Sequence, residues 1–150
     1  GVTKDTDVAR ISITKIPNTP GVAFKLFDVL AKHKINVDII LQSVGRDSTK
    51  DITFTVSKSN ADETVECVKN LFDIDDSNIT CDTSVAKISI VGAGMESHPG
   101  TASKMFEALY ERDINIDMIA TSEIKISVLI NLEDADRAVS AIHKAFFPAE

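Results

Sequence analysis

The chain contains no tryptophan, a single tyrosine and only two cysteines among its 150 residues. Cys67 and Cys81 form no Cys-x-x-Cys pair, so we expect no disulfide framework and interpret both thiols as reduced and structural. Together with His33, His98 and His143, they also lack the close spacing that metal ligands show in sequence. The composition therefore argues against a metal-carrying module, and no metal is expected here.

Positive charge and long apolar runs are scarce as well. The formal net charge is −7, which disfavours binding to nucleic-acid phosphates, and a lone tyrosine argues against a module that stacks RNA bases. No apolar run is long enough to cross a membrane, and residues 1–7 include no apolar signal segment. We expect a cytoplasmic protein without nucleic-acid or membrane partners. Since an initiator Met is lacking, we expect a processed chain or a segment of a longer one.

The chain does contain an internal repeat. Pro20-Gly21 recurs as Pro99-Gly100, and the correspondence continues without a gap at a constant spacing of 79 residues. The matched pairs are Ala23/Ala102, Lys25/Lys104, Phe27/Phe106, Leu30/Leu109, Ile35/Ile114, Asn36/Asn115, Asp38/Asp117 and Ile40/Ile119. Residues 51–72 match 125–146 in the same way, at a spacing of 74. The chain is therefore a duplication, and each copy is small enough to need a packing partner.

Hydrophobic periodicity predicts the elements of each copy. Alternation with a period of two predicts strands at 8–16, 36–42, 51–56 and 78–82, and in the second copy from 85, at 115–121 and at 126–130. Helical periodicity predicts helices at 20–34 and after Asn60, and at 99–112 and 135–147. Side-chain caps are expected from Thr19, Asn60 with Glu63, and Asp134. Leu41 is expected to point inward with Val37 and Ile39.

The resulting order of strand, helix, strand, strand, helix, strand is the ferredoxin-like split pattern. We predict an α+β fold of two tandem βαββαβ domains, with antiparallel sheets and helices on one face of each. The first domain covers 8–83 and the second 84–150. The second copy lacks a fourth strand, and an unpaired sheet edge is a liability. We expect residues 1–7, through Val2-Thr3-Lys4, to supply it.

The repeated polar residues are ones that a hydrophobic core does not need. Gly21 and Gly100 open helices whose free amides and positive dipole end suit a carboxylate, and glycine lets a ligand approach the backbone closely. Acceptors for an ammonium group follow in each copy: Asn36, Asp38, Asn115 and Asp117. A carboxylate site beside an ammonium site suits a free amino acid. The same residues also form ordinary helix starts and turns, so a purely structural role stays open.

Several longer motifs point to a family. The first copy carries Ile-Pro-Asn-Thr-Pro-Gly-Val-Ala (16–23), Ile-Asn-Val-Asp-Ile-Ile-Leu-Gln (35–42) and Asp-Ile-Thr-Phe-Thr-Val (51–56). The second carries Val-Gly-Ala-Gly-Met (91–95), Ser-His-Pro-Gly (97–100), Ile-Asn-Ile-Asp-Met-Ile (114–119) and Thr-Ser-Glu-Ile-Lys-Ile-Ser (121–127). Over essentially its whole length the chain resembles a pair of ACT domains, the amino-acid-sensing modules of biosynthetic enzymes. More narrowly, it resembles the C-terminal regulatory region of aspartokinase, of the beta subunit type.

The resemblance implies a regulatory part, without catalytic residues, of an enzyme that phosphorylates the side-chain carboxylate of aspartate with ATP. ATP and Mg²⁺ would belong to a kinase domain or alpha subunit, and no cofactor is expected in this segment. Gly92-Ala93-Gly94 lacks the Lys and Ser/Thr of a phosphate-binding loop. The resemblance also implies a homodimer in which the first ACT domain of one chain meets the second of the other. It further implies feedback inhibition by lysine, threonine or both, bound at the seams, that is, at the interfaces between these domains.

The resemblance further implies two sets of effector-binding residues. The threonine-type set is Asn18, Gly21, Val22, Ala23 and Gln42, with Asn115 and Ile116 from the partner copy. The lysine-type set is Met95, Ser97, His98, Gly100, Asp117, Thr121, Ser122 and Glu123, with Asn36, Val37 and Asp38 across the seam. The family usually has Asp where this chain has Asn18. The alternatives are an ACT pair from another amino-acid enzyme and a structural dimerisation module that binds no ligand.

Overall fold

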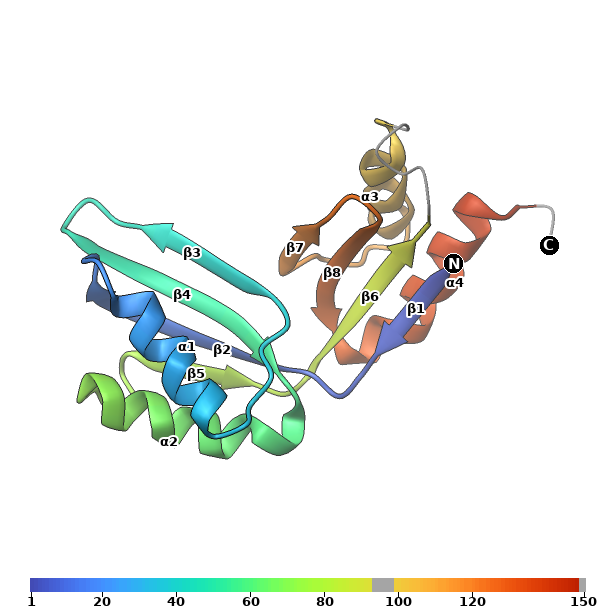
Figure 1. Ribbon diagram of the computed structural model, residues 1–150. Coiled ribbons are helices and arrows are strands. Elements are labelled where there is room, and N and C mark those ends of the chain that lie inside the picture. Colours follow the sequence, from blue (N-terminus) through green and yellow to red (C-terminus); the bar gives the residue numbers. More distant parts are fainter. Residues whose placement is uncertain (93–98, 149–150) are drawn as a thin grey trace. The chain divides into compact units, whose positions relative to one another are not determined.

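The computed structural model describes residues 1–92 and 99–148. These residues form two compact units, Asp7–Thr83 and Gly1–Thr6 with Ser84–Glu150, and Figure 1 shows their strands and helices. The strands are β1 (Val2–Asp5), β2 (Ala9–Pro17), β3 (Ile40–Val44), β4 (Thr49–Val56), β5 (Ile79–Asp82), β6 (Val85–Val91), β7 (Met118–Thr121) and β8 (Lys125–Asn131). The helices are α1 (Val22–Lys32), α2 (Ala61–Phe72), α3 (Thr101–Glu111) and α4 (Ala135–Phe146), with short 3-10 turns at Lys58–Asn60 and Leu132–Asp134.

Each unit contains one antiparallel four-stranded sheet and two helices, which confirms the predicted fold class. The strand order is β3-β4-β2-β5 in the unit of the first repeat and β1-β6-β8-β7 in the unit of the second. The N-terminal strand β1 pairs with β6 from Val2 opposite Ile90 to Asp5 opposite Lys87. It therefore holds the edge of the second sheet that β5 holds in the first, which is the place expected for it from the sequence.

The two hydrophobic cores are built from the same repeated positions. In the first repeat, Ile11 and Ile13 of β2 and Phe54 of β4 pack against Leu26 and Leu30 of α1. In the second, the corresponding core residues are Ile88, Ile90, Val128, Met105 and Leu109. Because side chains alternate across a strand, a single period-two pattern places every second residue of these strands under the helices.

Hydroxyl pairs occupy the sheet face away from each core. Ser12 lies opposite Thr53 with a distance of 3.0 Å between their hydroxyl oxygens, and Ser89 lies opposite Ser127 at 2.7 Å. Ser89 and Ser127 are each only 2% exposed. The repeat thus extends to a hydrogen bond across the central strand pair of each sheet.

The helix starts differ from the prediction. Helix α1 begins at Val22 rather than Pro20, since Pro20 and Gly21 form a turn and Gly21 is the cap with φ 92°. Asn60 and Asp134 make no side-chain capping hydrogen bond. Both end a 3-10 turn and have φ of −98° and −93°, whereas a side-chain cap needs an extended residue at that place. The predicted caps from Thr19, Asn60 and Asp134 are therefore wrong.

The second strand of the first repeat also differs. It begins at Ile40 rather than at residue 36, because the Ile39 amide donates to the Thr55 hydroxyl at 3.0 Å instead of joining a regular ladder. Leu41 then pairs with Thr53, on the face away from the core, and is 40% exposed. The prediction that Leu41 points inward is wrong.

Candidate functional site

The start of α1 is the part of the first repeat that the sequence marks most strongly. Gly21 adopts φ 92° and ψ −12°, and a Cβ added there would meet no atom within 4 Å. Glycine is thus required here for its backbone conformation and not for space. The amides that follow, from Val22 and Ala23, belong to the first turn, where a helix has no acceptors of its own. The Val22 amide reaches only the Thr19 carbonyl, at 3.5 Å.

Gly100, its counterpart in the second repeat, caps α3 with φ −85° and ψ 0°. This conformation is open to any residue, and a Cβ there would also meet nothing within 4 Å. The two glycines therefore share a place in the fold and not a backbone requirement.

The loop before α1 is tied to the turn between β3 and β4. The Asn18 amide donates to the Ser48 carbonyl at 3.0 Å, and the Asn18 side chain is exposed. Within that turn, the Asp47 carboxylate accepts from the Thr49 hydroxyl at 2.5 Å and from the Thr49 amide at 3.3 Å. These hydrogen bonds lower the pKa of Asp47 below its ordinary value. The turn is therefore held against the start of α1.

Gln42 lies on the edge strand beside this loop. It pairs with Ile52, and directly opposed residues point to the same face of a sheet. Because Ile52 belongs to the core under the helices, the exposed Gln42 side chain projects from the helix-covered face. Asn18, Gly21, Val22, Ala23 and Gln42 thus lie on one unit, on α1, the loop before it and the edge strand.

The Asn-x-Asp segments lie at the other end of their helices. The Asp38 amide donates to the Thr55 carbonyl at 3.1 Å, and the Asp117 amide donates to the Leu129 carbonyl at 2.8 Å. Thr55 and Leu129 are matched positions in the repeat, so the same backbone bond holds both segments. Each preceding helix has 11 residues, about 16 Å at 1.5 Å per residue. In a single repeat, the Gly-led helix start and the Asn-x-Asp segment are therefore too far apart to hold one amino acid.

The lysine-type set is described in part. Met95, Ser97 and His98 lie outside the described residues. Thr121 ends β7 opposite Ile126, and the Ser122 amide donates to the Lys125 carbonyl at 2.8 Å, which closes the turn to β8. Glu123 is exposed in that turn. The remaining members are placed as follows: Gly100 caps α3, Asp117 precedes β7, and Asn36, Val37 and Asp38 occupy the segment between α1 and β3. Asn115 and Ile116 of the threonine-type set occupy the matching segment between α3 and β7.

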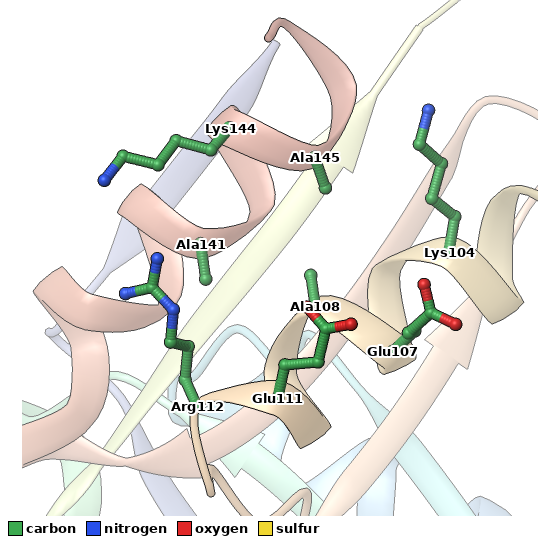
Figure 2. Close-up of a pocket in the computed structure, with 8 residues that line it drawn as sticks. All are labelled: Lys104, Glu107, Ala108, Glu111, Arg112, Ala141, Lys144 and Ala145. Carbon is green, nitrogen blue, oxygen red and sulfur yellow. The ribbon is translucent and has the colours of Figure 1, made fainter.

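Each unit has a groove between its two helices. One, of about 350 Å³, is lined by Lys104, Glu107, Ala108, Glu111, Arg112, Ala141, Lys144 and Ala145, and Figure 2 shows the three alanines between α3 and α4 with charged side chains around them. The other, of about 360 Å³, has Val29, His33, Glu63, Glu66, Cys67, Asn70 and Leu71 as its lining. Small residues that face each other, Ala108 on α3 with Ala141 and Ala145 on α4, account for the first groove. Neither contains a described member of the two effector sets.

The described residues provide neither a cluster of metal ligands nor a reactive thiolate. They contain no group of three or more His, Cys, Asp or Glu side chains placed to hold a metal ion. Both cysteines are free, and burial, with nearby carboxylates, raises the pKa of the Cys67 and Cys81 thiols, so neither is a reactive thiolate at neutral pH. None of the helices in the described ranges is long and apolar enough to span a membrane.

Lys50 is a residue that the sequence analysis did not single out. It lies in β4, one residue before the strand predicted at 51–56, and it is only 6% exposed. The sequence held one signal for this position, because Lys50 continues the alternation of Ile52, Phe54 and Val56 by one step toward the turn.

Comparison with known proteins places these features in a family. A family model described as the ACT domain matches residues 11–72 and 88–146. The chain is 46% identical over 147 residues to an aspartate kinase of Pseudomonas fluorescens and 45% identical over 146 residues to an aspartokinase of Helicobacter pylori. Each match covers 97% of this chain and 36% of the relative, so the chain spans about a third of the length of these curated relatives.

Two solved structures match over nearly their full length. The regulatory subunit of aspartate kinase from Thermus thermophilus is 41% identical, with a TM-score of 0.89 and 97% of each chain covered. A structure of aspartokinase alpha and beta subunits is 40% identical, with a TM-score of 0.88 and the same coverage. The chain belongs to the ACT-domain family and, within it, to the regulatory regions of aspartate kinases.

Proposed function

We propose that this chain binds free lysine, threonine or both, and thereby mediates feedback inhibition of an aspartate kinase in the synthesis of aspartate-derived amino acids. The parent enzyme converts L-aspartate and ATP into 4-phospho-L-aspartate, and its catalytic residues, ATP and Mg²⁺ belong to a kinase domain or alpha subunit in the cytoplasm. This chain would bind the effector and regulate the activity of that kinase domain. The observation that supports the proposal is that each repeat has a Gly-led helix start and an Asn-x-Asp segment at opposite ends of one helix. We propose that the first is a half-site for a carboxylate and the second a half-site for an ammonium group.

Two half-sites so far apart become one site only if another repeat completes them. The start of α1 would meet Asn115 and Ile116 of a second copy, and the start of α3 would meet Asn36, Val37 and Asp38 of a second copy. Such pairing requires an open sheet edge, and β3 and β7 are edge strands. Ile40 on β3 and Ile119 on β7 are 50% and 43% exposed. Exposed apolar edges of this kind are normally covered, and a homodimer would cover them.

Charge distinguishes the two effector sites. Of the carboxylates in the lysine-type set, Glu123 is exposed in the β7–β8 turn and Asp38 would lie across the seam, whereas Asp117 lies a helix length from Gly100 and would not share a ligand with it. Lysine carries two ammonium groups, so a site with surplus negative charge favours it over threonine. The threonine-type set has the neutral Asn18 and Gln42, which suit a ligand with a hydroxyl side chain.

Inhibition would follow from coupling between binding and dimer arrangement. An amino acid that bridges two copies stabilises the arrangement in which its two half-sites are aligned. A coupling free energy of about 1–3 kcal/mol changes affinity by roughly five- to 150-fold. This range is enough for an end product to regulate a kinase domain through a few contacts.

Thermal unfolding of the chain with each common amino acid at millimolar concentration tests the proposal. A ligand at 100 times its dissociation constant adds about 2.7 kcal/mol to the free energy of unfolding, so a rise of several degrees in Tm with lysine, threonine or both is expected. Glu123→Gln should remove the lysine response while leaving the Tm without ligand in place, because Glu123 is exposed in the β7–β8 turn. Asp113→Asn is the matched control, because it removes the same charge at an exposed residue outside the site. A lack of response to any amino acid would favour a purely structural pair, and a response to other amino acids only would favour a different enzyme.

A further inference from the structure

The side chain of Lys50 enters the core side of the first sheet. Lys50 pairs with Ile16 of β2 and with Val44 of β3. Lys50 lies two residues before Ile52 and four before Phe54 in β4, so its side chain points to the same face of the sheet as theirs. The side chains of Ile52 and Phe54 pack under the helices. Lys50 is 6% exposed and Ile16 is 2% exposed. The aliphatic part of the lysine therefore packs against apolar neighbours, as lysine stems commonly do.

The ammonium group of Lys50 has no protein anion to pair with in the described ranges. Other lysines there form ion pairs at the surface, such as Lys4 with Asp136 and Lys32 with Asp28, whereas no hydrogen bond or ion pair joins the Lys50 side chain to a described residue. No described side-chain nitrogen is both fully enclosed and unbonded, so the Lys50 ammonium touches water. Because the residue as a whole is only 6% exposed, its charge has little contact with water and is costly without a partner.

Lys50 lies in the same part of the unit as the threonine-type residues Asn18, Gly21, Val22, Ala23 and Gln42, which would form the effector site of the first repeat. Lys50 lies diagonally across from Gln42 on the same sheet face, since Gln42 pairs with Ile52 and Val44 pairs with Lys50, and diagonal neighbours of this kind are about 7–8 Å apart. Figure 1 shows that α1 begins at the end of this sheet where β2 ends and the β3–β4 turn lies. The ammonium group and the positive end of the α1 dipole thus lie at the same end of the unit, and both favour an anion.

We propose that Lys50 is a specificity-determining residue of the first-repeat effector site and binds the carboxylate of the amino acid. This inference rests on the proposed function. The carboxylate would accept hydrogen bonds from the Lys50 ammonium and from the amides at the start of α1, and its charge would offset that of the lysine. The matched position in the second repeat is Ile124, which is 56% exposed. The second-repeat site therefore lacks this cation, and the two sites hold a carboxylate by different means.

Calorimetric titration of the chain with L-lysine, L-threonine and their carboxamides tests the proposal. Lys50→Met keeps most of the stem and removes the charge. It should weaken binding of the amino acid that occupies the first repeat by about ten- to 100-fold, as expected for loss of a charge-assisted hydrogen bond. It should also abolish the preference of that site for the acid over the amide, which a merely structural role would not change. Lys50→Arg should keep the preference.

Lys32→Met is the matched control, because it removes the same charge at an exposed residue near the far end of α1, and it should leave every affinity within about threefold. Affinities and acid preference that survive Lys50→Met would overturn the inference and leave the proposed function intact. If Lys50→Met does not fold, the acid preference of the wild-type chain and of Lys50→Arg decides whether the inference stands.

If the wild-type chain binds neither amino acid, the proposed function fails for this chain. Titration with acetate, followed by the NMR signals of the Lys50 side chain, then decides: saturable shifts support a carboxylate site, and their absence overturns it.

Discussion

The two helix-capping glycines offer a test with an internal control. Gly21 has φ 92° and Gly100 has φ −85°, and at both positions an added Cβ would meet no atom within 4 Å. Replacement by alanine therefore creates no clash at either place. It restricts the unfolded chain equally in both cases, and it exchanges glycine for alanine at a helix cap in both cases. What differs is the backbone conformation alone.

The left-handed conformation costs an L-residue about 1–2 kcal/mol relative to the right-handed one. Gly21→Ala should thus lower the free energy of unfolding by about 1–2 kcal/mol more than Gly100→Ala does. For domains of 60–100 residues, this corresponds to roughly 4–8 °C in Tm per kcal/mol. Gly21→Asn should cost less than Gly21→Ala, because asparagine tolerates the left-handed region better.

Urea unfolding followed by circular dichroism measures the difference, with the transitions of the two units fitted separately if they do not coincide. The slope of the free energy against urea concentration should stay unchanged, which shows that each variant unfolds from the same state. Equal losses for Gly21→Ala and Gly100→Ala would refute the reasoning, because they would mean that the φ of Gly21 contributes nothing to its requirement for glycine.

Three further outcomes are expected. Ser89→Ala should cost about 1–3 kcal/mol in urea unfolding, because it leaves the buried Ser127 hydroxyl unsatisfied, and the double alanine variant should cost less than the sum of the single ones; additive losses would contradict this. Asp7 accepts hydrogen bonds from Ser57 and Lys58, which lower its pKa below the ordinary 3.8, so its contribution to stability is present above that pH and is lost as the pH falls through the lower folded-state pKa. Asp7→Asn should therefore flatten the acid side of the stability curve, and superimposable curves would speak against it. Ile40→Lys or Ile119→Lys should reduce the dimer fraction in sedimentation velocity while changing monomer stability by about 0.5 kcal/mol or less; an unchanged dimer would exclude the β3 and β7 edges as the interface.

Much of the fold was predictable from the sequence because it depends on local periodicity and on the repeat. Alternation in Ile11, Ile13, Ile52 and Phe54 identifies strands and the face that they bury, whatever their partners are. The repeat then transfers each element of one copy to the other. The pairing of the N-terminal strand with the second sheet could also be inferred. The second copy lacks one of the four strands of the pattern, and a short strand-forming segment precedes the first copy.

The helix starts were less predictable, because they depend on how the chain enters each helix. Asn60 and Asp134 have the composition of side-chain caps, yet the 3-10 turns before α2 and α4 place them in a helical conformation. Thr19 precedes a turn whose conformation is set by Gly21. The residues of these caps were evident in the sequence, but the backbone angles that decide their role were not.

For the candidate site, too, some features follow from the sequence and others only from the tertiary structure. The sequence by itself determined that a Gly-led helix start and an Asn-x-Asp segment occur twice, because both are short motifs that the repeat makes visible. Only the tertiary structure decided that these motifs lie a helix length apart within one repeat, and that Lys50 is buried at the end of the first unit where α1 begins. The burial of Lys50 depends on which residues of β2 and β3 face it across the sheet, and strand register is set by pairing between distant parts of the chain rather than by neighbours in sequence.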